Sequence, residues 1–300
     1  QQELLNIVIV GGGATGIEVA GILSEMKKFV LPNDYPDMPS SLMHIYLIEA
    51  GPRLLAGMSE ESSAHAEQFL REMGVNILLN KRVVDYRDHK VVLEDGTEIA
   101  TRTFIWVSGV TGVTIGNLDA SLIGRGGRIK VDSFNRVEGM NNVFAIGDQC
   151  IQLADENYPN GHPQLAQVAI QQGELLAKNL IRMEKGQEMK PFHYRNLGSM
   201  ATVGRNRAVA EFSKVKMQGW FAWVMWLVVH LRSILGVRNK VIVLLNWVWN
   251  YFTYDQSMRM IVYARKAKEI RDREKVEETT HWGKELVQEE KNPSITSSSK

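Results

Sequence analysis

The sequence predicts an α/β protein with a parallel sheet, on three observations. An apolar run at residues 7–10 breaks into glycines and then resumes with the apolar spacing of a helix. Residues 44–79 repeat the alternation of strand, helix and strand, which is typical of doubly wound folds. Between residues 83 and 99 the apolar runs become short and are joined by tight turns, which predicts an inserted antiparallel β-meander.

The glycine-rich turn has the spacing of a dinucleotide-binding fingerprint. Gly11 permits a tight turn from strand to helix, Gly13 lets the backbone approach a pyrophosphate, and Gly16 lets helix and strand pack closely. We expect Gly12 and Thr15 of the same turn to contact the dinucleotide, whose phosphates would meet free N–H groups at the helix N-terminus. An accidental glycine-rich turn is the alternative, but the strand before it and the apolar helix face after it are the context that the motif requires. We therefore predict a Rossmann-like dinucleotide-binding domain.

An acidic residue ends the second predicted strand, residues 44–49. Glu49 takes the position from which a carboxylate binds a cofactor ribose, and we interpret it as the residue that selects NAD. It lies further from the glycine turn than usual because of a proline-rich segment, residues 31–39. We predict that segment to be a surface loop that ends the first helix near residue 30. An ordinary strand-end carboxylate is the alternative, and Arg53 leaves room for NADP.

The next elements complete the predicted nucleotide domain. Residues 60–73 have the pattern of a helix stopped by a glycine, and residues 75–79 that of a third strand. After the meander, residues 104–109 return to a buried strand, and Gly109 at its end is a candidate cofactor contact. The glycine cluster at residues 124–127 enters no helix, so it is not a second phosphate loop.

Two further strands are predicted at residues 129–132 and 143–148. In the second, Gly147 lets the backbone come close to a ligand, and Asp148 offers an acceptor for a sugar or ribitol hydroxyl. A plain Gly-Asp turn is the alternative. A helix opened by Pro163 follows at once, which favours the ligand-binding interpretation.

That predicted helix, residues 164–181, carries two glutamines four residues apart. Gln167 and Gln171 therefore lie on one face, where uncharged amides could hold a carbonyl group without titrating. Solvated surface glutamines are an equally good interpretation from the sequence alone.

Composition narrows the classes of function. The chain has 300 residues, 44% of them hydrophobic, which is enough for a substantial core in about two domains. A net charge of +1 argues against bulk binding of nucleic acid, and a single cysteine, Cys150, excludes an internal disulfide. No metal site is predicted. The chain enters its first strand almost at once without a signal peptide, which suggests a fragment or a processed end.

The C-terminal region combines apolar residues, tryptophans and cations. The apolar stretch 219–229 is too short to span a bilayer, and a second apolar run at residues 241–245 is followed by aromatic residues: Trp247, Trp249, Tyr251 and Phe252. This pattern is typical of helices in the membrane interface, and a buried helical hairpin or a dimer interface is the alternative. Further basic residues would attract anionic lipid: Arg259, Arg265, Lys266 and Lys268. From about residue 269 the chain is charge-rich, and we expect a mobile tail.

Several signatures together resemble the type II NADH:quinone oxidoreductases. They comprise Gly11–Glu18 with Glu49, Phe144–Asp148, Ala166–Gln171, and Pro191–Tyr194 through Met200–Arg205. The resemblance implies an NADH-binding domain at residues 1–112, the second half of an FAD-binding domain at 113–212, interfacial anchor helices at 213–265 and a tail at 266–300. The first FAD half, with its own glycine loop, is missing from the sequence.

The resemblance also implies roles for residues. NADH would give hydride to FAD, and two electrons would pass to a membrane quinone. Glu18 would lie near the nicotinamide and the flavin, Gly147 and Asp148 near the ribityl-phosphate side, and Gln167 with Gln171 beside the quinone. The implied location is peripheral, at the cytoplasmic face of a membrane, and homodimer formation stays open. The rival interpretation is a membrane-associated nucleotide-binding or partner-binding module without turnover.

Overall fold

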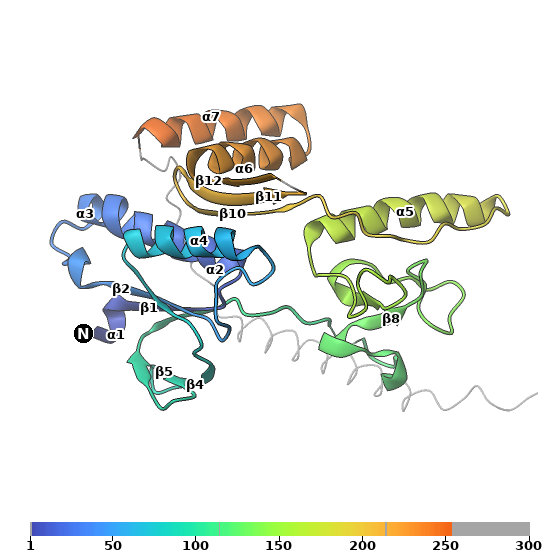
Figure 1. Cartoon of the computed structure of the whole chain (residues 1–300), viewed down its shortest axis with the longest axis horizontal. Helices are drawn as coiled ribbons and strands as arrows, with labels where there is room; N and C mark the ends of the chain where they lie inside the picture. The colour runs from blue at the N-terminus through green and yellow to red at the C-terminus, as the bar shows by residue number, and fades with distance from the viewer. Residues whose placement is uncertain (1, 114, 214, 254–300) are drawn as a thin grey trace, which may run out of the picture. The chain divides into compact units, whose positions relative to one another are not determined.

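A computed structural model describes residues 2–113, 115–213 and 215–253 (Figure 1). The chain forms two compact units, Gln1–Val248 and Trp249–Lys300, and the packing described below belongs to the first. The elements of its first half are α1 (Gln2–Leu5), β1 (Asn6–Val10), α2 (Ala14–Glu25), the π-helical turn η1 (Met26–Val30), α3 (Leu31–Asp34), β2 (His44–Ile48), α4 (Glu60–Glu72), β3 (Val75–Leu78), β4 (Val83–Arg87), β5 (Lys90–Leu93), β6 (Glu98–Ala100) and β7 (Thr103–Trp106).

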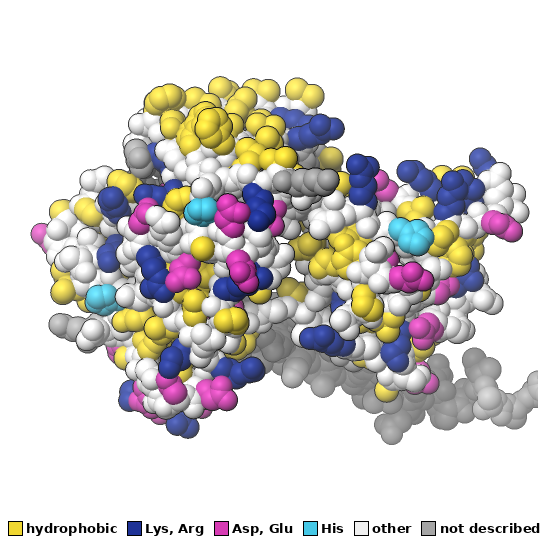
Figure 2. Space-filling view, viewed as in Figure 1, with side chains coloured by type: hydrophobic (Ala, Val, Ile, Leu, Met, Phe, Trp, Pro, Cys, Tyr) yellow, Lys and Arg dark blue, Asp and Glu magenta, His cyan; other side chains and the backbone are white. Residues whose placement is uncertain are grey.

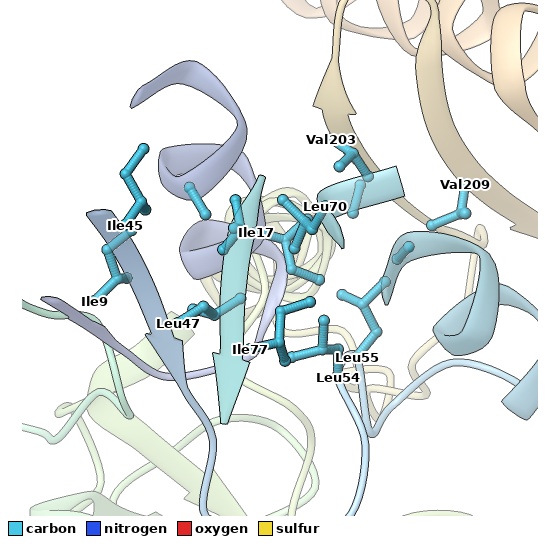
Figure 3. Packing of buried hydrophobic residues seen from close by; sticks show 14 of the residues in the cluster. Ile9, Ile17, Ile45, Leu47, Leu54, Leu55, Leu70, Ile77, Val203 and Val209 are labelled. Carbon is cyan, nitrogen blue, oxygen red and sulfur yellow. The ribbon is translucent and has the colours of Figure 1, made fainter. Parts of the chain in front are cut away.

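Four of these strands form the predicted parallel sheet, in the order β3-β2-β1-β7. β1 is buried at every position, as its unbroken apolar sequence requires, and pairs Ile9 with Leu47 of β2. Against one face lies a continuous core that includes Ile17 of α2 and Leu70 of α4, shown with its neighbours in Figure 3. The sheet therefore fixes where β1 ends and where α2 begins.

The antiparallel meander is confirmed. β4, β5 and β6 pair in that order, and Val91 and Leu93 of β5 bury one face of the small sheet against Val8 and Val10 of β1. The strand after the meander differs from its prediction of a buried strand. β7 is shorter than residues 104–109 and lies at the edge of the sheet, where the Trp106 side chain is 55% exposed.

The proline-rich segment also differs from its prediction. The first helix does not stop near residue 30, because η1 and α3 continue its path as far as Asp34. Pro32 lies in the first turn of α3, where no N–H group is required for an intrahelical hydrogen bond. Only residues 35–39 remain as the predicted loop.

The middle of the chain contains less regular structure. It holds β8 (Ile129–Val131), the short 3-10 turn η5 (Gly147–Gln149), β9 (Cys150–Gln152) and α5 (Ala166–Glu184). The predicted strand 143–148 is wrong. Those residues make one isolated bridge, Arg136 with Phe144, and the backbone turns at Gly147, so the strand that pairs with β8 is β9. The helix begins at Ala166 and not after Pro163, which lies before it in an irregular segment.

An antiparallel sheet and two helices follow: β10 (Ser199–Gly204), β11 (Arg207–Phe212), β12 (Val215–Gln218), α6 (Gly219–Ser233) and α7 (Val237–Thr253). α2 packs closely on β10, and this close approach requires a glycine at position 21: a Cβ there would lie 1.7 Å from the carbonyl oxygen of Val203. α6 packs on β11 through Ala222, which is buried with Ala208 and Ala210. This second sheet thus contacts the fingerprint helix on one side and the apolar helix α6 on the other.

Candidate functional site

The glycine turn between β1 and α2 leaves room for a ligand to approach the protein backbone closely. Gly11 has φ of +117°, and a Cβ at Gly16 would lie 1.8 Å from the carbonyl oxygen of Gly11, so neither position accepts a side chain. At Gly13 the added Cβ would meet no atom within 4 Å. Gly13 and Thr15 are exposed, so the N-terminal end of α2 is open to solvent. Open space beside helix N–H groups fits a dinucleotide pyrophosphate.

Glu49 directly follows β2, and its carboxylate is hydrogen-bonded to the glycine turn. Its Oε2 accepts a hydrogen bond from Gly12 N–H (2.6 Å), and its Oε1 accepts one from Gly51 N–H (2.7 Å). The side chain is half-buried, and a carboxylate oxygen can accept a second hydrogen bond. Glu49 can therefore order the turn and still accept from a ribose hydroxyl group.

Arg53 is engaged within its own loop. Its Nη1 donates to the carbonyl oxygen of Met58 (2.7 Å), and its Nη2 donates to that of Ala56 (2.9 Å). In the sequence, Arg53 keeps NADP open as an alternative cofactor, because an arginine at this place can bind a 2′-phosphate. With both terminal nitrogens on backbone carbonyls, the guanidinium is not free in this conformation to grip a 2′-phosphate as a bidentate donor.

The turn at Gly147 has a different support. Gly147 has φ of +64°, and its N–H donates to Oε1 of Gln172 (2.6 Å), a side chain that is 1% exposed. Asp148 is exposed beside it, as a ligand-binding carboxylate must be. Sequence reasoning missed Gln172. Its signal was a polar residue on the buried stripe of α5, in line with Val168 and Asn179.

Gln167 and Gln171 share a face of α5, as predicted, and both amides are occupied. Gln167 donates to Gly198 O (3.0 Å) and accepts from Leu197 N–H (3.1 Å). Gln171 donates to Arg195 O (2.9 Å) and accepts from Arg195 N–H (3.1 Å). The two side chains thus bind the backbone that leads into β10, so their amides order that segment whatever else they contact.

Glu18 lies on the first half of α2 and faces β10 and α6. Burial raises the pKa of its carboxyl above the ordinary value, although Thr202 N–H, the charge of His230 and the Trp226 indole oppose that rise. The Thr202 contact is long, at 3.5 Å. The ring of His230 stacks on Trp226 with 3.9 Å between centroids. A half-buried carboxyl with a raised pKa keeps its proton to a higher pH than an ordinary glutamate does, which suits a group that exchanges protons.

The predicted residues fall into two groups. The glycine turn, Glu49 and Glu18 lie around α2. Gln167 and Gln171 are connected to this group indirectly, because they bind the backbone segment that leads into β10. Gly147 and Asp148 form a separate turn supported by α5. Gly109 has φ of +84° and open space around its Cβ position, and it follows Ser108, whose backbone lies against the glycine turn, 3.0 Å from where a Cβ at Gly11 would be.

The surface of α6 and of the start of α7 is apolar, as Figure 2 shows along the top of the molecule. Phe221 is 69% exposed and Val228 is 57% exposed, and Trp226 lies 6.3 Å from Trp247 between ring centroids. Within the described part of the chain, no helix combines the length and the hydropathy that a membrane crossing requires. The basic residues from Arg259 onward and the predicted tail lie outside the described residues.

Comparison with known proteins identifies families and relatives that this chain resembles. The pyridine nucleotide-disulphide oxidoreductase family matches residues 1–173, and the NDH2 C-terminal domain matches residues 196–254. The type II NADH:quinone oxidoreductase NdhA of Mycobacterium tuberculosis is 35% identical over 260 residues, which cover 82% of this chain and 54% of the relative. The internal alternative NAD(P)H-ubiquinone oxidoreductase A1 of Arabidopsis thaliana mitochondria is 32% identical over 269 residues, covering 84% and 52%.

A solved structure agrees in fold. NDH2 from Plasmodium falciparum in complex with NADH superposes with a TM-score of 0.75 over 84% of this chain and 66% of that chain, at 20% identity. The chain spans about half the length of the curated relatives that it matches.

Proposed function

This chain belongs to the pyridine nucleotide-disulphide oxidoreductase family and, within it, to the type II NADH dehydrogenases, and on that premise we propose that it is the NADH-binding and quinone-reducing portion of such an enzyme. The observation that carries the proposal is the open turn at Gly13, flanked by a carboxylate that already orders it. FAD, when bound, would accept hydride from NADH and pass two electrons to a quinone.

Each candidate residue then has a role. The turn from Gly11 to Gly16 would hold the pyrophosphate of NADH on helix N–H groups, and Glu49 would accept from the ribose. Gly147 offers a close backbone approach to the flavin, and the exposed Asp148 offers an acceptor for a ribityl hydroxyl.

Glu18 and the two glutamines would serve the quinone side. Glu18, which lies beside β10, is a half-buried carboxyl with a raised pKa, and such a group can supply a proton to a reduced quinone. Gln167 and Gln171 would shape this side by holding residues 195–198 in place through four hydrogen bonds.

A single methyl group tests the dinucleotide site. Gly13 has φ of −75° and open space around its Cα, so Gly13→Ala should leave folding unchanged while placing a methyl where the pyrophosphate approaches. We expect NADH affinity, measured by fluorescence titration of the 300-residue chain, to fall at least about tenfold. Gly116→Ala, equally free of contacts and far along the chain from the turn, is the control and should bind as wild type does. Equal affinity in all three proteins would refute the assignment.

Flavin retention separates this proposal from a module without turnover. The sequence contains one glycine-rich turn between a strand and a helix, and we assign it to NADH. We therefore expect the 300-residue chain, purified alone, to bind NADH without stoichiometric FAD, as its absorbance spectrum would report. Adding the other half of a full-length relative should restore the flavin band and NADH-dependent quinone reduction, and NADH binding without either would favour the module.

We also propose that α6 and α7 lie in the headgroup region of a bilayer, which is where exposed tryptophans and apolar side chains are favoured. The cytoplasmic face stays a prediction. Val228→Ser should weaken sedimentation with anionic liposomes, while Val84→Ser in the meander, where the side chain is 56% exposed against 57% at Val228, should not. If both proteins sediment like wild type and Val228→Ser instead changes the mass seen by light scattering, the surface is a dimer interface.

A further inference from the structure

The segment after β2 encloses the first peptide of the glycine turn. Gly12 N–H donates to Oε2 of Glu49, and the carbonyl oxygen of Gly12 accepts from Leu55 N–H (2.8 Å). Both polar atoms of Gly12 are therefore occupied by residues 49–58, which we call the clasp. The clasp leaves no room for a side chain at Gly12, since a Cβ there would lie 2.7 Å from Cδ2 of Leu54.

Leu55 makes its hydrogen bond from an unusual backbone conformation. Its φ is +46°, in the left-handed region that a residue with a bulky side chain rarely occupies. The side chain is 6% exposed and lies in the core beside Leu54 and Leu70 (Figure 3). Core packing therefore holds Leu55 in a conformation that its own backbone disfavours, and strain of this kind is concentrated at functional sites.

The rest of the clasp is fixed by hydrogen bonds that do not involve the N–H group of Leu55. Arg53 bridges the carbonyl oxygens of Ala56 and Met58, and Ser63 Oγ donates to the carbonyl oxygen of Leu54 (2.6 Å). Met58 N–H donates to the carbonyl oxygen of Leu55 (2.8 Å). These bonds determine where the clasp lies, and the φ angle of Leu55 determines that its N–H group points at Gly12.

We infer that Leu55 is a positioning residue of the dinucleotide site. Its left-handed conformation aims its N–H at the Gly12 carbonyl, which fixes the orientation of the following peptide, so that Gly13 and the N–H groups of the first turn of α2 face solvent before NADH arrives. A preordered turn loses less conformational freedom on binding. The strained conformation of Leu55 therefore costs stability in the free protein but increases its affinity for the pyrophosphate. The inference rests on the proposed NADH site.

The test alters the backbone preference of residue 55 and keeps it apolar. Leu55→Val introduces a β-branched residue, which tolerates positive φ worst, whereas Leu55→Met keeps an unbranched side chain of similar volume. We expect Leu55→Val to weaken NADH binding about tenfold at a temperature where circular dichroism shows it folded, because a strained left-handed residue shifts equilibria by about that factor. Leu55→Met should bind within about twofold of wild type.

A third variant separates positioning from stability. Asparagine adopts the left-handed conformation readily but is polar, so Leu55→Asn should melt at a lower temperature than Leu55→Val and yet bind NADH more tightly. If affinity follows melting temperature across the three variants, or if Leu55→Val binds NADH like wild type, the positioning role is wrong. If the wild-type chain itself binds no NADH, the proposed function fails instead.

Discussion

The two glycine turns of this chain are each fixed by a side-chain oxygen, yet they differ in what that oxygen can still do. Gly12 N–H and Gly147 N–H both donate over 2.6 Å, the first to the carboxylate of Glu49 and the second to the amide of Gln172. Glu49 is half-buried and can accept from a ligand as well, whereas Gln172 is 1% exposed and serves the fold alone. The same kind of hydrogen bond thus leaves an oxygen within reach of a ligand in one region and serves only the fold in the other.

The surroundings of the two turns also differ, with more regular structure around the first turn than around the second. The first turn follows a strand that is buried along its whole length within a four-stranded sheet. The second lies in residues 115–196, where the regular sheet has two strands and the buried apolar clusters are small. Hydrogen bonds from side chains to the backbone, such as those of Asn179 with Lys190, help to hold the second region together.

The largest expected effect tests that difference with a pair of helical glycines. A Cβ at Gly21 of α2 would lie 1.7 Å from the Val203 carbonyl oxygen, whereas a Cβ at Gly173 of α5 would make an ordinary contact of 3.7 Å with Ile146. Gly21→Ala should destabilise the chain by about 3 kcal/mol through forced overpacking. Gly173→Ala should stabilise it by about 0.5–1 kcal/mol, because alanine favours helix. Urea unfolding midpoints measure both, and a stable Gly21→Ala would mean that α2 and β10 can separate.

A smaller effect is expected from removing the oxygen that holds each turn. Gln172→Met leaves the partly buried Gly147 N–H without its acceptor and should cost about 1–2 kcal/mol. Glu49→Gln keeps one of two acceptor oxygens on a side chain that is more exposed than Gln172, and it should cost about 1 kcal/mol or less while weakening NADH binding. Denaturant unfolding without ligand gives the ranking. A reversed order would indicate that the turn at Gly12 depends on its carboxylate more than the turn at Gly147 depends on its amide.

The sequence predicted the nucleotide region well because its signals are local. Strand β1, the glycine turn and Glu49 follow one another in the order that a parallel sheet imposes, so their positions could be inferred without knowledge of the rest. In the middle region the apolar run 143–148 satisfied the strand pattern but pairs through one bridge only, because Gly147 turns the backbone away. Strand pairing depends on partners distant in sequence, which the pattern does not contain.

The site was predicted in part for the same reason. Gln167 and Gln171 were placed on one face by helical spacing, which is correct, but their backbone partners 24 to 31 residues away had no local signal. Leu55 is the clearest limit. Nothing in the local sequence indicates a leucine at positive φ, because only the packing of the whole core holds it there.

The smallest expected effect is a difference in pH dependence between Glu18 in the first region and Asp155 in the second. Burial raises the pKa of Glu18 above its ordinary 4.5, so the native state holds that proton more tightly than the unfolded chain. The resulting stability is complete below pH 4.5 and is lost as the pH rises through the raised value. Burial would also raise the pKa of Asp155, but hydrogen bonds from His162 (3.0 Å) and Asn157 N–H (3.0 Å) lower it below 3.8 overall.

The stability from Asp155 is therefore present above pH 3.8 and is lost as the pH falls through the lowered value. The advantage of wild type over Glu18→Gln should shrink as the pH rises from 4.5 toward neutrality. The advantage over Asp155→Asn should shrink only as the pH falls below 3.8. Urea unfolding from pH 3 to about pH 7 distinguishes the two slopes. Parallel slopes would mean that Glu18 is solvated like an ordinary surface carboxylate, which would remove the physical basis for the proposal that it supplies a proton beside β10.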